Sequence, residues 1–224
     1  SAFFGCSNLT VNAIDTPNLT SVTDMSKMFA LCTSFNSDLN SWDLRNVTNI
    51  SELFSGAINF NQPLGNWDVS SVTNMFGAFI NATAFNQPLG SWDVKNVTDM
   101  SQLFDSATAF DQNLGNWDIS SVTSMNLMFN NVTLSTENYD NILIDWFTLS
   151  TGELQIPQNV PFDGGNSTYC LGEAARTNLI NNYGWTITDG GLVTCNTGFF
   201  VTTWQTTTVN ETITIPTEGT GYNY

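Results

Sequence analysis

The amino-acid sequence predicts an α/β solenoid, in which short coils stack on one another and each coil buries its apolar side chains against its neighbours. The stretch FNQPLGNWDVSSVTNMFGAF (residues 60–79) returns almost unchanged as FNQPLGSWDVKNVTDMSQLF (residues 85–104). Aromatic residues recur every 25 residues through four full units, and a period of roughly 20 to 50 residues is typical of solenoids. The 224 residues also include enough apolar side chains for a sizeable core.

Three rows of aromatic residues define the repeat. The rows are Phe35, Phe60, Phe85 and Phe110; Trp42, Trp67, Trp92 and Trp117; and Phe54, Phe79, Phe104 and Phe129. A looser unit precedes them, with Met25 and Phe29 in matching places. We therefore expect residues 1–133 to form one continuous stack of coils.

Each coil is expected to contain a strand and a helical segment. Leu64, Trp67 and Val69 follow the L-x-x-L-x-L spacing of leucine-rich repeats, which predicts a short strand whose alternate residues point inward. The strands of successive coils are then expected to form a short parallel β-sheet. Apolar spacings of three and four in residues 72–79 favour a helical turn on the other side. The expected fold is a right-handed, leucine-rich-repeat-like stack of 25-residue coils.

The repeat ends after Phe129, and we expect residues 134–195 to cap the stack. Residues 136–149 predict a helix with one apolar face that seals the end of the stack, formed by Tyr139, Ile142, Leu143 and Trp146. Three further elements complete the expected cap: a strand in residues 154–165, a helix in residues 172–184 that Gly184 closes, and a strand in residues 185–195.

Residues 196–224 change in character. They are rich in threonine and alternate polar with β-branched or aromatic residues, which is typical of β-strands. We expect them to begin a following β-sandwich-like domain. A chain that starts inside a repeat and stops inside a domain is expected to be a piece of a longer protein.

The four cysteines are arranged as two pairs. Cys6 and Cys32 hold the same place in consecutive coils, and Cys170 and Cys195 bracket a compact segment. Three pairings are possible, but only Cys6–Cys32 together with Cys170–Cys195 keeps each disulfide local. The alternative for Cys6 and Cys32 is that they are reduced, small hydrophobic residues in the core.

The charge balance excludes several classes of partner. The chain has 20 acidic and 4 basic residues, no histidine and a formal net charge of −16. Nucleic acid is excluded as a partner because its phosphates require lysine and arginine, and anionic membrane surfaces are disfavoured for the same reason. The sequence contains neither an apolar run of transmembrane length nor a signal peptide, so direct membrane insertion is not expected.

The sequence gives little support for an enzyme. Without histidine there is no Ser-His or Cys-His pair and no imidazole metal ligand. Chemistry with two carboxylates remains formally open, as in glycosidases. Because nothing in the sequence marks such a pair, the interpretation is that the chain is not an enzyme and has no catalytic residues.

The coils carry a family resemblance in the pattern F-N-x-P-L-x-x-W-D-V-S-x-V-T-x-M, which residues 60–75 match nearly letter for letter. This pattern resembles the repeat of the BspA-like leucine-rich repeat surface proteins. The resemblance implies a secreted or cell-surface, non-enzymatic protein that attaches to other cells, matrix proteins or glycans. It also implies a very long multidomain chain, in which the cap is followed by an immunoglobulin-like or polycystic-kidney-disease-like domain.

A row of acidic residues is the candidate binding face. If Trp67 and Val69 point inward, the residues between and beside them point outward. The face then consists of Asp43, Asp68, Asp93 and Asp118, with Ser41, Asn66, Ser91 and Asn116 beside them. Carboxylates that are ~4.8 Å apart repel one another unless something neutralises them. Arg45 and Lys95 are one source of positive charge, and bound calcium, the only cofactor considered, is another. The third interpretation is a purely structural hydrogen-bond ladder.

Other repeated polar residues favour structural or modification roles. The asparagine row is expected to bond backbone groups of the next coil and consists of Asn36, Asn61, Asn86 and Asp111. The threonine row is expected to cap turns or helix starts rather than to bind ice or glycan, and consists of Thr48, Thr73, Thr98 and Thr123. Asp105-Ser106-Ala107 resembles a short bacterial O-glycosylation signal, which makes Ser106 the glycosylation candidate.

Two functions follow from these features. The first is an extracellular or cell-surface adhesion module that contacts a protein or glycan on another cell or on matrix through the acidic face. The second is a structural spacer or filament building block, whose partners are neighbouring domains or subunits of a surface assembly.

Overall fold

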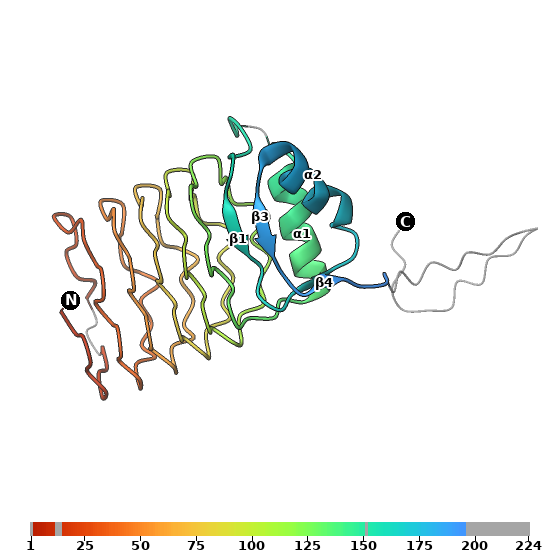
Figure 1. Cartoon of the computed structure of the whole chain (residues 1–224). Coiled ribbons are helices and arrows are strands. Elements are labelled where there is room, and N and C mark those ends of the chain that lie inside the picture. The colour runs from red at the N-terminus through yellow and green to blue at the C-terminus, as the bar shows by residue number, and fades with distance from the viewer. Residues whose placement is uncertain (1, 12–14, 151, 196–224) are drawn as a thin grey trace, which may run out of the picture.

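The computed structural model describes residues 2–11, 15–150 and 152–195. The expected β-strands of residues 196–224 lie outside this described part. Figure 1 shows a row of similar coils that stack along one axis and end against two helices. Within the described residues, no helix is long and apolar enough to cross a membrane.

Backbone hydrogen bonds join the coils in parallel. Single parallel bridges connect equivalent residues of successive coils, namely Asp24, Asn49, Asn74, Asp99 and Ser124. After each bridge, alternate N–H groups of one coil donate to carbonyls of the next, as from Met75 to Asp99 (3.0 Å) and from Phe79 to Leu103 (2.9 Å). The coils therefore share a parallel ladder through residues 75–81 and its equivalents.

The position of this ladder corrects the expected elements of the coil. The segment predicted as a strand is built from turns, because Trp67 N–H donates to the Leu64 carbonyl (3.1 Å) and the segment makes no ladder to its neighbour. The segment predicted as helical, residues 72–79, instead contains the ladder. Its apolar spacing of three and four arises because tight turns alternate with ladder bonds, as where Ala78 N–H donates to the Met75 carbonyl (3.1 Å).

The ladder segment needs two left-handed residues in each coil. One row has φ between 52° and 59° and consists of Lys27, Glu52, Gly77, Gln102 and Leu127. The other row has φ between 55° and 71° and consists of Leu31, Gly56, Asn81, Ser106 and Asn131. A left-handed conformation costs an L-residue about 1–2 kcal/mol, and glycine avoids this cost. Most coils therefore carry local strain that the stacking of neighbouring coils offsets.

Gln102→Gly is expected to raise the free energy of unfolding by roughly 0.5–1 kcal/mol. Relief of the left-handed strain exceeds the extra chain entropy of glycine, and Gly77 already occupies the equivalent place one coil earlier. Urea unfolding measures the change. The matched control, Gly77→Ala, is expected to destabilise, since the added Cβ would lie 2.5 Å from Ile80 Cδ1. A loss of stability in Gln102→Gly would contradict the role given to strain.

Stacked aromatic rings form the spine of the core. In one column the ring centroids of Phe29, Phe54, Phe79, Phe104 and Phe129 follow one another at 5.4–5.6 Å. A second column contacts the first with centroids 3.9–4.5 Å apart, and consists of Phe35, Phe60, Phe85 and Phe110. These side chains are fully buried or nearly so. In the middle of the stack each ring thus contacts a ring of the other column and the equivalent rings before and after it, as Phe79 contacts Phe85, Phe54 and Phe104.

Polar ladders connect the same coils. The expected role of the asparagine row is confirmed: the side-chain oxygens of Asn36, Asn61 and Asn86 accept the N–H at the equivalent position of the next coil, each at 2.9 Å. The tryptophan indoles add a second ladder, as where Trp92 Nε1 donates to the Leu64 carbonyl (3.0 Å). The threonine row is not a set of caps, because each hydroxyl donates to the threonine carbonyl one coil earlier.

The first helix of the cap, α1 (Thr136–Phe147), ends these ladders. Its N-cap Ser135 and the side chain of Asn138 both donate hydrogen bonds to the Asp111 carboxylate. Asp111 stands at the position that asparagine holds in the earlier coils, and its carboxylate accepts several hydrogen bonds from the helix. Trp146 Nε1 donates to the Leu114 carbonyl (3.1 Å) and so continues the indole ladder inside the helix. The predicted helix and its buried apolar face are confirmed.

The rest of the cap adds two rungs to the backbone ladder. A parallel bridge joins Met125 to Phe162 in β1 (Pro161–Asp163), and β1 pairs in parallel with β3 (Thr186–Thr188). A second parallel pair joins β2 (Thr168–Tyr169) to β4 (Gly191–Leu192). The other helix, α2 (Glu173–Tyr183), ends as predicted at Gly184, which is left-handed with φ 71°.

Candidate binding face

The four aspartates of the acidic row are held by identical turns. In each, one carboxylate oxygen accepts the backbone N–H two residues later: Ser70 N–H donates to Asp68 (3.1 Å), and Ser120 N–H donates to Asp118 (2.9 Å). In the same way, Arg45 N–H donates to Asp43 and Lys95 N–H donates to Asp93. The row therefore lies on turns at the edge of the stack and not on the face of a sheet, which corrects the expected placement.

Basic side chains neutralise alternate members of the row. Arg45 pairs with Asp43 at 2.8 Å, and Lys95 pairs with Asp93 at 2.7 Å. The hydrogen bond from the Arg45 side chain lowers the pKa of Asp43, and the hydrogen bond from the Ser70 hydroxyl lowers that of Asp68. Among the described residues, no basic side chain forms an ion pair with Asp68 or Asp118.

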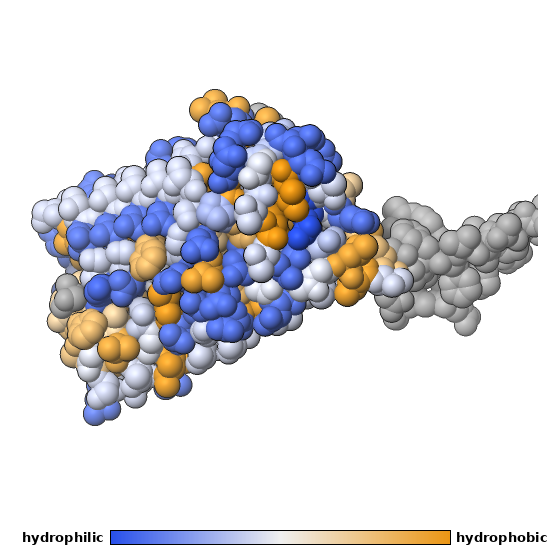
Figure 2. All heavy atoms as spheres, in the orientation of Figure 1, coloured by the Kyte–Doolittle hydropathy of each residue, from blue (hydrophilic) through white to orange (hydrophobic). Residues whose placement is uncertain are grey.

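The residues beside the aspartates are exposed at the same edge: Ser41, Asn66, Ser91 and Asn116. Two of them also bond the preceding coil. Ser91 Oγ donates to the Gly65 carbonyl (3.2 Å), and Asn66 N–H donates to the Asn40 side chain (3.0 Å). These residues are thus partly structural, while the side chains of Asp43 and Asp93 stay 43% and 44% exposed. Figure 2 shows hydrophilic bands that run along the stack on the visible face.

The acidic row does not form a cluster typical of a calcium site. Within the described ranges, no group of three or more Asp, Glu, Cys or His side chains converges to hold a metal ion. Calcium requires six to eight oxygen ligands, whereas Asp43 and Asp93 each already face a cation.

A chelator is therefore expected to leave the melting temperature unchanged, as is added calcium. The physical reason is that calcium would have to displace Arg45 and Lys95 from the row. Thermal melts of purified protein with EGTA and with millimolar calcium measure this, and magnesium serves as the control ion. A calcium-dependent rise in melting temperature would show that the row binds the metal.

The predicted Cys170–Cys195 disulfide is present in the cap. The expected Cys6–Cys32 disulfide is absent, and both residues are free thiols. The reason lies in their side chains: Cys32 Sγ points into the core and donates to the Phe3 carbonyl (2.9 Å), whereas Cys6 is exposed.

Ser106, the glycosylation candidate, is half-buried and already hydrogen-bonded. Its hydroxyl donates to Asp105 (2.8 Å) and accepts from the Asn131 side chain (3.2 Å). Attachment of a sugar to Ser106 Oγ would have to break the first of these bonds.

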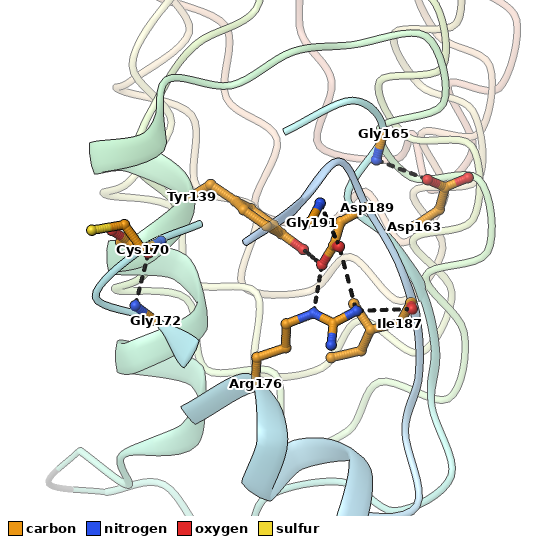
Figure 3. A network of polar contacts seen from close by, with 10 residues as sticks. Tyr139, Asp163, Gly165, Cys170, Gly172, Arg176, Ile187, Asp189 and Gly191 are labelled. Atoms are coloured by element: carbon orange, nitrogen blue, oxygen red, sulfur yellow. Dashed lines mark hydrogen bonds and ion pairs between the residues drawn. The ribbon is translucent and has the colours of Figure 1, made fainter. Parts of the chain in front are cut away.

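A polar cluster in the cap was not identified from the sequence (Figure 3). Asp189 accepts from Tyr139 Oη (2.9 Å) and from Arg176 Nε (2.7 Å), and the guanidinium lies 4.9 Å from the centre of the Tyr169 ring. Burial raises the pKa of Tyr139 well above its ordinary value, and the nearby Asp189 carboxylate adds to this effect. The polar groups of the cluster are hydrogen-bonded to one another. The cluster therefore joins α1, through Tyr139, and α2, through Arg176, to the chain at Asp189.

A second part of the cap is held by Asp140. Its buried carboxylate accepts the N–H groups of Cys170, Leu171 and Gly172 at 2.8–2.9 Å. A hollow of about 360 Å³ lies beside it, between α1 and the disulfide. Because all of these bonds go to the backbone of the cap, the Asp140 carboxylate serves to tie α1 to the chain before α2.

The sequence contains a repeated motif from which the cluster around Asp189 could have been identified. Asp-Gly-Gly occurs at residues 163–165 and again at residues 189–191, and in both the aspartate accepts the N–H of the second glycine. The spacing nearly equals the coil period, so the motif marks the cap as two further rungs of the same stack.

These features define a class of repeat protein in which 25-residue coils are joined by aromatic columns and by ladders of side-chain and backbone hydrogen bonds. The family model described as "Mycoplasma protein of unknown function, DUF285" matches residues 1–94 and 32–142. The chain belongs to this family. No curated protein and no solved structure matches the chain significantly.

Proposed function

We propose that the protein is a non-enzymatic, extracellular adhesion module of the BspA-like leucine-rich repeat type, which binds a protein or glycan through its acidic row. Its coils form a leucine-rich-repeat-like solenoid that presents one copy of the row position per coil. The observation that carries the proposal is the row itself: four aspartates in identical turns, of which Asp68 and Asp118 keep their charge free of any ion pair within the described residues.

Rigidity supports this proposal. The turns of the row rest on coils whose cores are columns of stacked rings, so the carboxylates keep a fixed spacing before a partner arrives. Such pre-organisation reduces the entropy lost on binding. The Cys170–Cys195 disulfide supports an extracellular location, since disulfides persist in oxidising compartments.

A structural spacer is the second candidate function. The observation in its favour is that most repeated polar side chains bond the neighbouring coil, as in the asparagine and threonine rows. A chain of this kind holds other domains at a distance through its length and stiffness. Its neighbours in a surface assembly would be its partners.

Neutralisation of Asp68 and Asp118 distinguishes the two functions. In Asp68→Asn/Asp118→Asn, the asparagine oxygens still accept the N–H groups of the turns, so the fold is kept while both charges are lost. If the row binds a partner, attachment of protein-coated beads to fibronectin-coated or mannan-coated surfaces is expected to fall about tenfold or more. Bead counts under defined flow give the measurement.

The matched control changes net charge by the same amount elsewhere. Asp15→Asn/Glu173→Gln neutralises two exposed carboxylates outside the row and is expected to attach like the wild type. If the wild type and both double variants attach equally, the proposal that the acidic row binds the partner is wrong. Failure of the wild type to attach to either surface would favour the spacer function.

A further inference from the structure

The Cys170–Cys195 disulfide lies where the chain leaves the cap. Cys195 comes shortly after β4, and the sequence continues beyond it to Tyr224. Its partner Cys170 directly follows β2. The disulfide joins residues with a sequence separation of 25, and the loop between them contains α2, β3 and β4. A pull on the chain beyond Cys195 therefore reaches Cys170 through the disulfide, without passing through that loop.

The segment that begins at Cys170 is held by a buried carboxylate on α1. One oxygen of Asp140 accepts the N–H groups of Cys170 and Gly172, each at 2.8 Å, and the other accepts the N–H of Leu171 at 2.9 Å. Figure 3 shows Cys170 and Gly172 against this helix. Asp140 is 4% exposed, so water competes little for these bonds. Hydrogen bonds to a charged acceptor are also stronger than bonds between neutral groups.

Helix α1 is in turn fixed to the last coils of the stack. Ser135 and Asn138, at the start of the helix, donate to the Asp111 carboxylate at 2.8–2.9 Å. Near its end, Trp146 Nε1 donates to the Leu114 carbonyl at 3.1 Å. Because these contacts lie near both ends of the helix, α1 moves as one piece with the stack. A continuous series of strong contacts thus leads from Cys195 to the coils.

The pairing of β4 would resist the same pull poorly on its own. This strand has two residues and pairs only with the two residues of β2, and one further bond joins Val193 N–H to the Tyr169 carbonyl (2.9 Å). The side chains of Leu192 and Val193 are 53% and 38% exposed. Without the disulfide, force on Cys195 would act first on this pair of strands, and then on β3 and α2 in turn.

We propose that the Cys170–Cys195 disulfide and the Asp140 carboxylate form a mechanical clamp. Force that enters at Cys195 passes through the disulfide to Cys170, and from there to β2 and, through three hydrogen bonds, to α1 and the coil stack. Helix α2, β3 and β4 lie outside this path, so the cap stays closed under tension. The use of the clamp rests on the proposed function, since attachment to a partner supplies the pull, but the clamp itself is measured without a partner.

The test pulls single molecules of the whole chain in an optical trap, through peptide tags fused to its two ends. Cys170→Ser/Cys195→Ser is expected to open first in an early step at lower force, before the coil stack opens. This step is expected to lengthen the chain by about 80 Å, since an extended chain spans about 3.3–3.6 Å per residue over the 25 positions. Wild-type molecules reduced with dithiothreitol after tethering give the same measurement if the double variant folds poorly.

Asp140→Asn tests the second part of the clamp. Asparagine keeps one acceptor oxygen but turns an NH2 group toward at least one of the three N–H groups. The oxidised variant is therefore expected to open roughly 10- to 100-fold faster than the wild type at the same force. The matched control is Glu137→Gln, which neutralises an exposed carboxylate on the same helix and is expected to open like the wild type. In reduced protein, Asp140→Asn is expected to leave the early step unchanged, because the force then enters through β4.

Two results would overturn the clamp. One is a reduced protein that opens at the same force as the oxidised protein, with no early step. The other is oxidised Asp140→Asn that opens no faster than oxidised Glu137→Gln. Neither result depends on attachment to a coated surface, so the clamp and the binding face can be disproved separately.

Discussion

Arg176→Met is expected to lower the free energy of unfolding of the cap by roughly 3–5 kcal/mol. The guanidinium is the cation that faces Asp189, whose side chain is 2% exposed, and it bonds this carboxylate at 2.7 Å. Removal of one partner leaves a buried charge that the remaining Tyr139 hydroxyl and Gly191 N–H do not neutralise. Methionine fills similar space, so the loss reports charge more than packing.

Urea unfolding followed by near-UV circular dichroism measures this loss. The double variant Arg176→Met/Asp189→Asn is expected to recover much of the stability, because asparagine removes the buried charge; its side-chain oxygen still accepts the Gly191 N–H, and its NH2 group donates to the Tyr139 hydroxyl oxygen. Lys95→Met, which breaks an exposed pair with Asp93, is expected to leave the unfolding midpoint nearly unchanged. Equal losses in Arg176→Met and in the double variant would mean that packing, not charge, holds the cap.

The periodic part of the fold could be predicted because each coil repeats the same chemistry. The 25-residue spacing of Phe54, Phe79 and Phe104 requires that these rings contact one another once the coils stack, and they do. The asparagine row could be predicted for the same reason, since an amide repeated once per coil meets the equivalent backbone of its neighbour. Both helices of the cap also followed from apolar spacing and from Gly184.

The path of the backbone inside a coil could not be predicted from apolar spacing. Residues 72–79 have the spacing of a helix, but the chain makes tight turns around two left-handed residues and forms the ladder there. Glycine would have revealed this conformation, but only Gly56 and Gly77 stand at left-handed positions of these rows. At the other positions the stack imposes the left-handed conformation on residues such as Glu52 and Gln102, whose residue types do not indicate it.

The candidate face shows the same division between what could and could not be predicted. The regular aspartate row and its pairing with Arg45 and Lys95 follow from sequence spacing. Its support on turns could not be inferred, because an aspartate beside a strand and an aspartate that caps a turn have the same sequence pattern. The cluster around Asp189 depends on contacts between residues 13 and 50 positions apart, which only the closed cap brings together.

Phe79→Ala is expected to lower the free energy of unfolding of the coil stack by roughly 3–5 kcal/mol. Phe79 is 1% exposed and lies at the middle of the spine. Its ring stacks on Phe54 at 5.5 Å, Phe104 at 5.4 Å and Phe85 at 4.3 Å. The alanine variant therefore loses apolar burial and leaves a cavity that faces both adjacent coils.

The stack transmits this loss because each coil is stabilised only by its neighbours. A weakened central interface is expected to separate the coils before it from the coils after it, so that one cooperative transition in urea becomes two. The matched control is Phe3→Ala in the first described coil, where the ring is partly buried and, among the residues that the structure describes, stacks only on Phe29. Phe3→Ala is expected to cost about 1 kcal/mol and to keep a single transition. Equal losses from both variants would show that the spine does not act as a one-dimensional chain of interfaces.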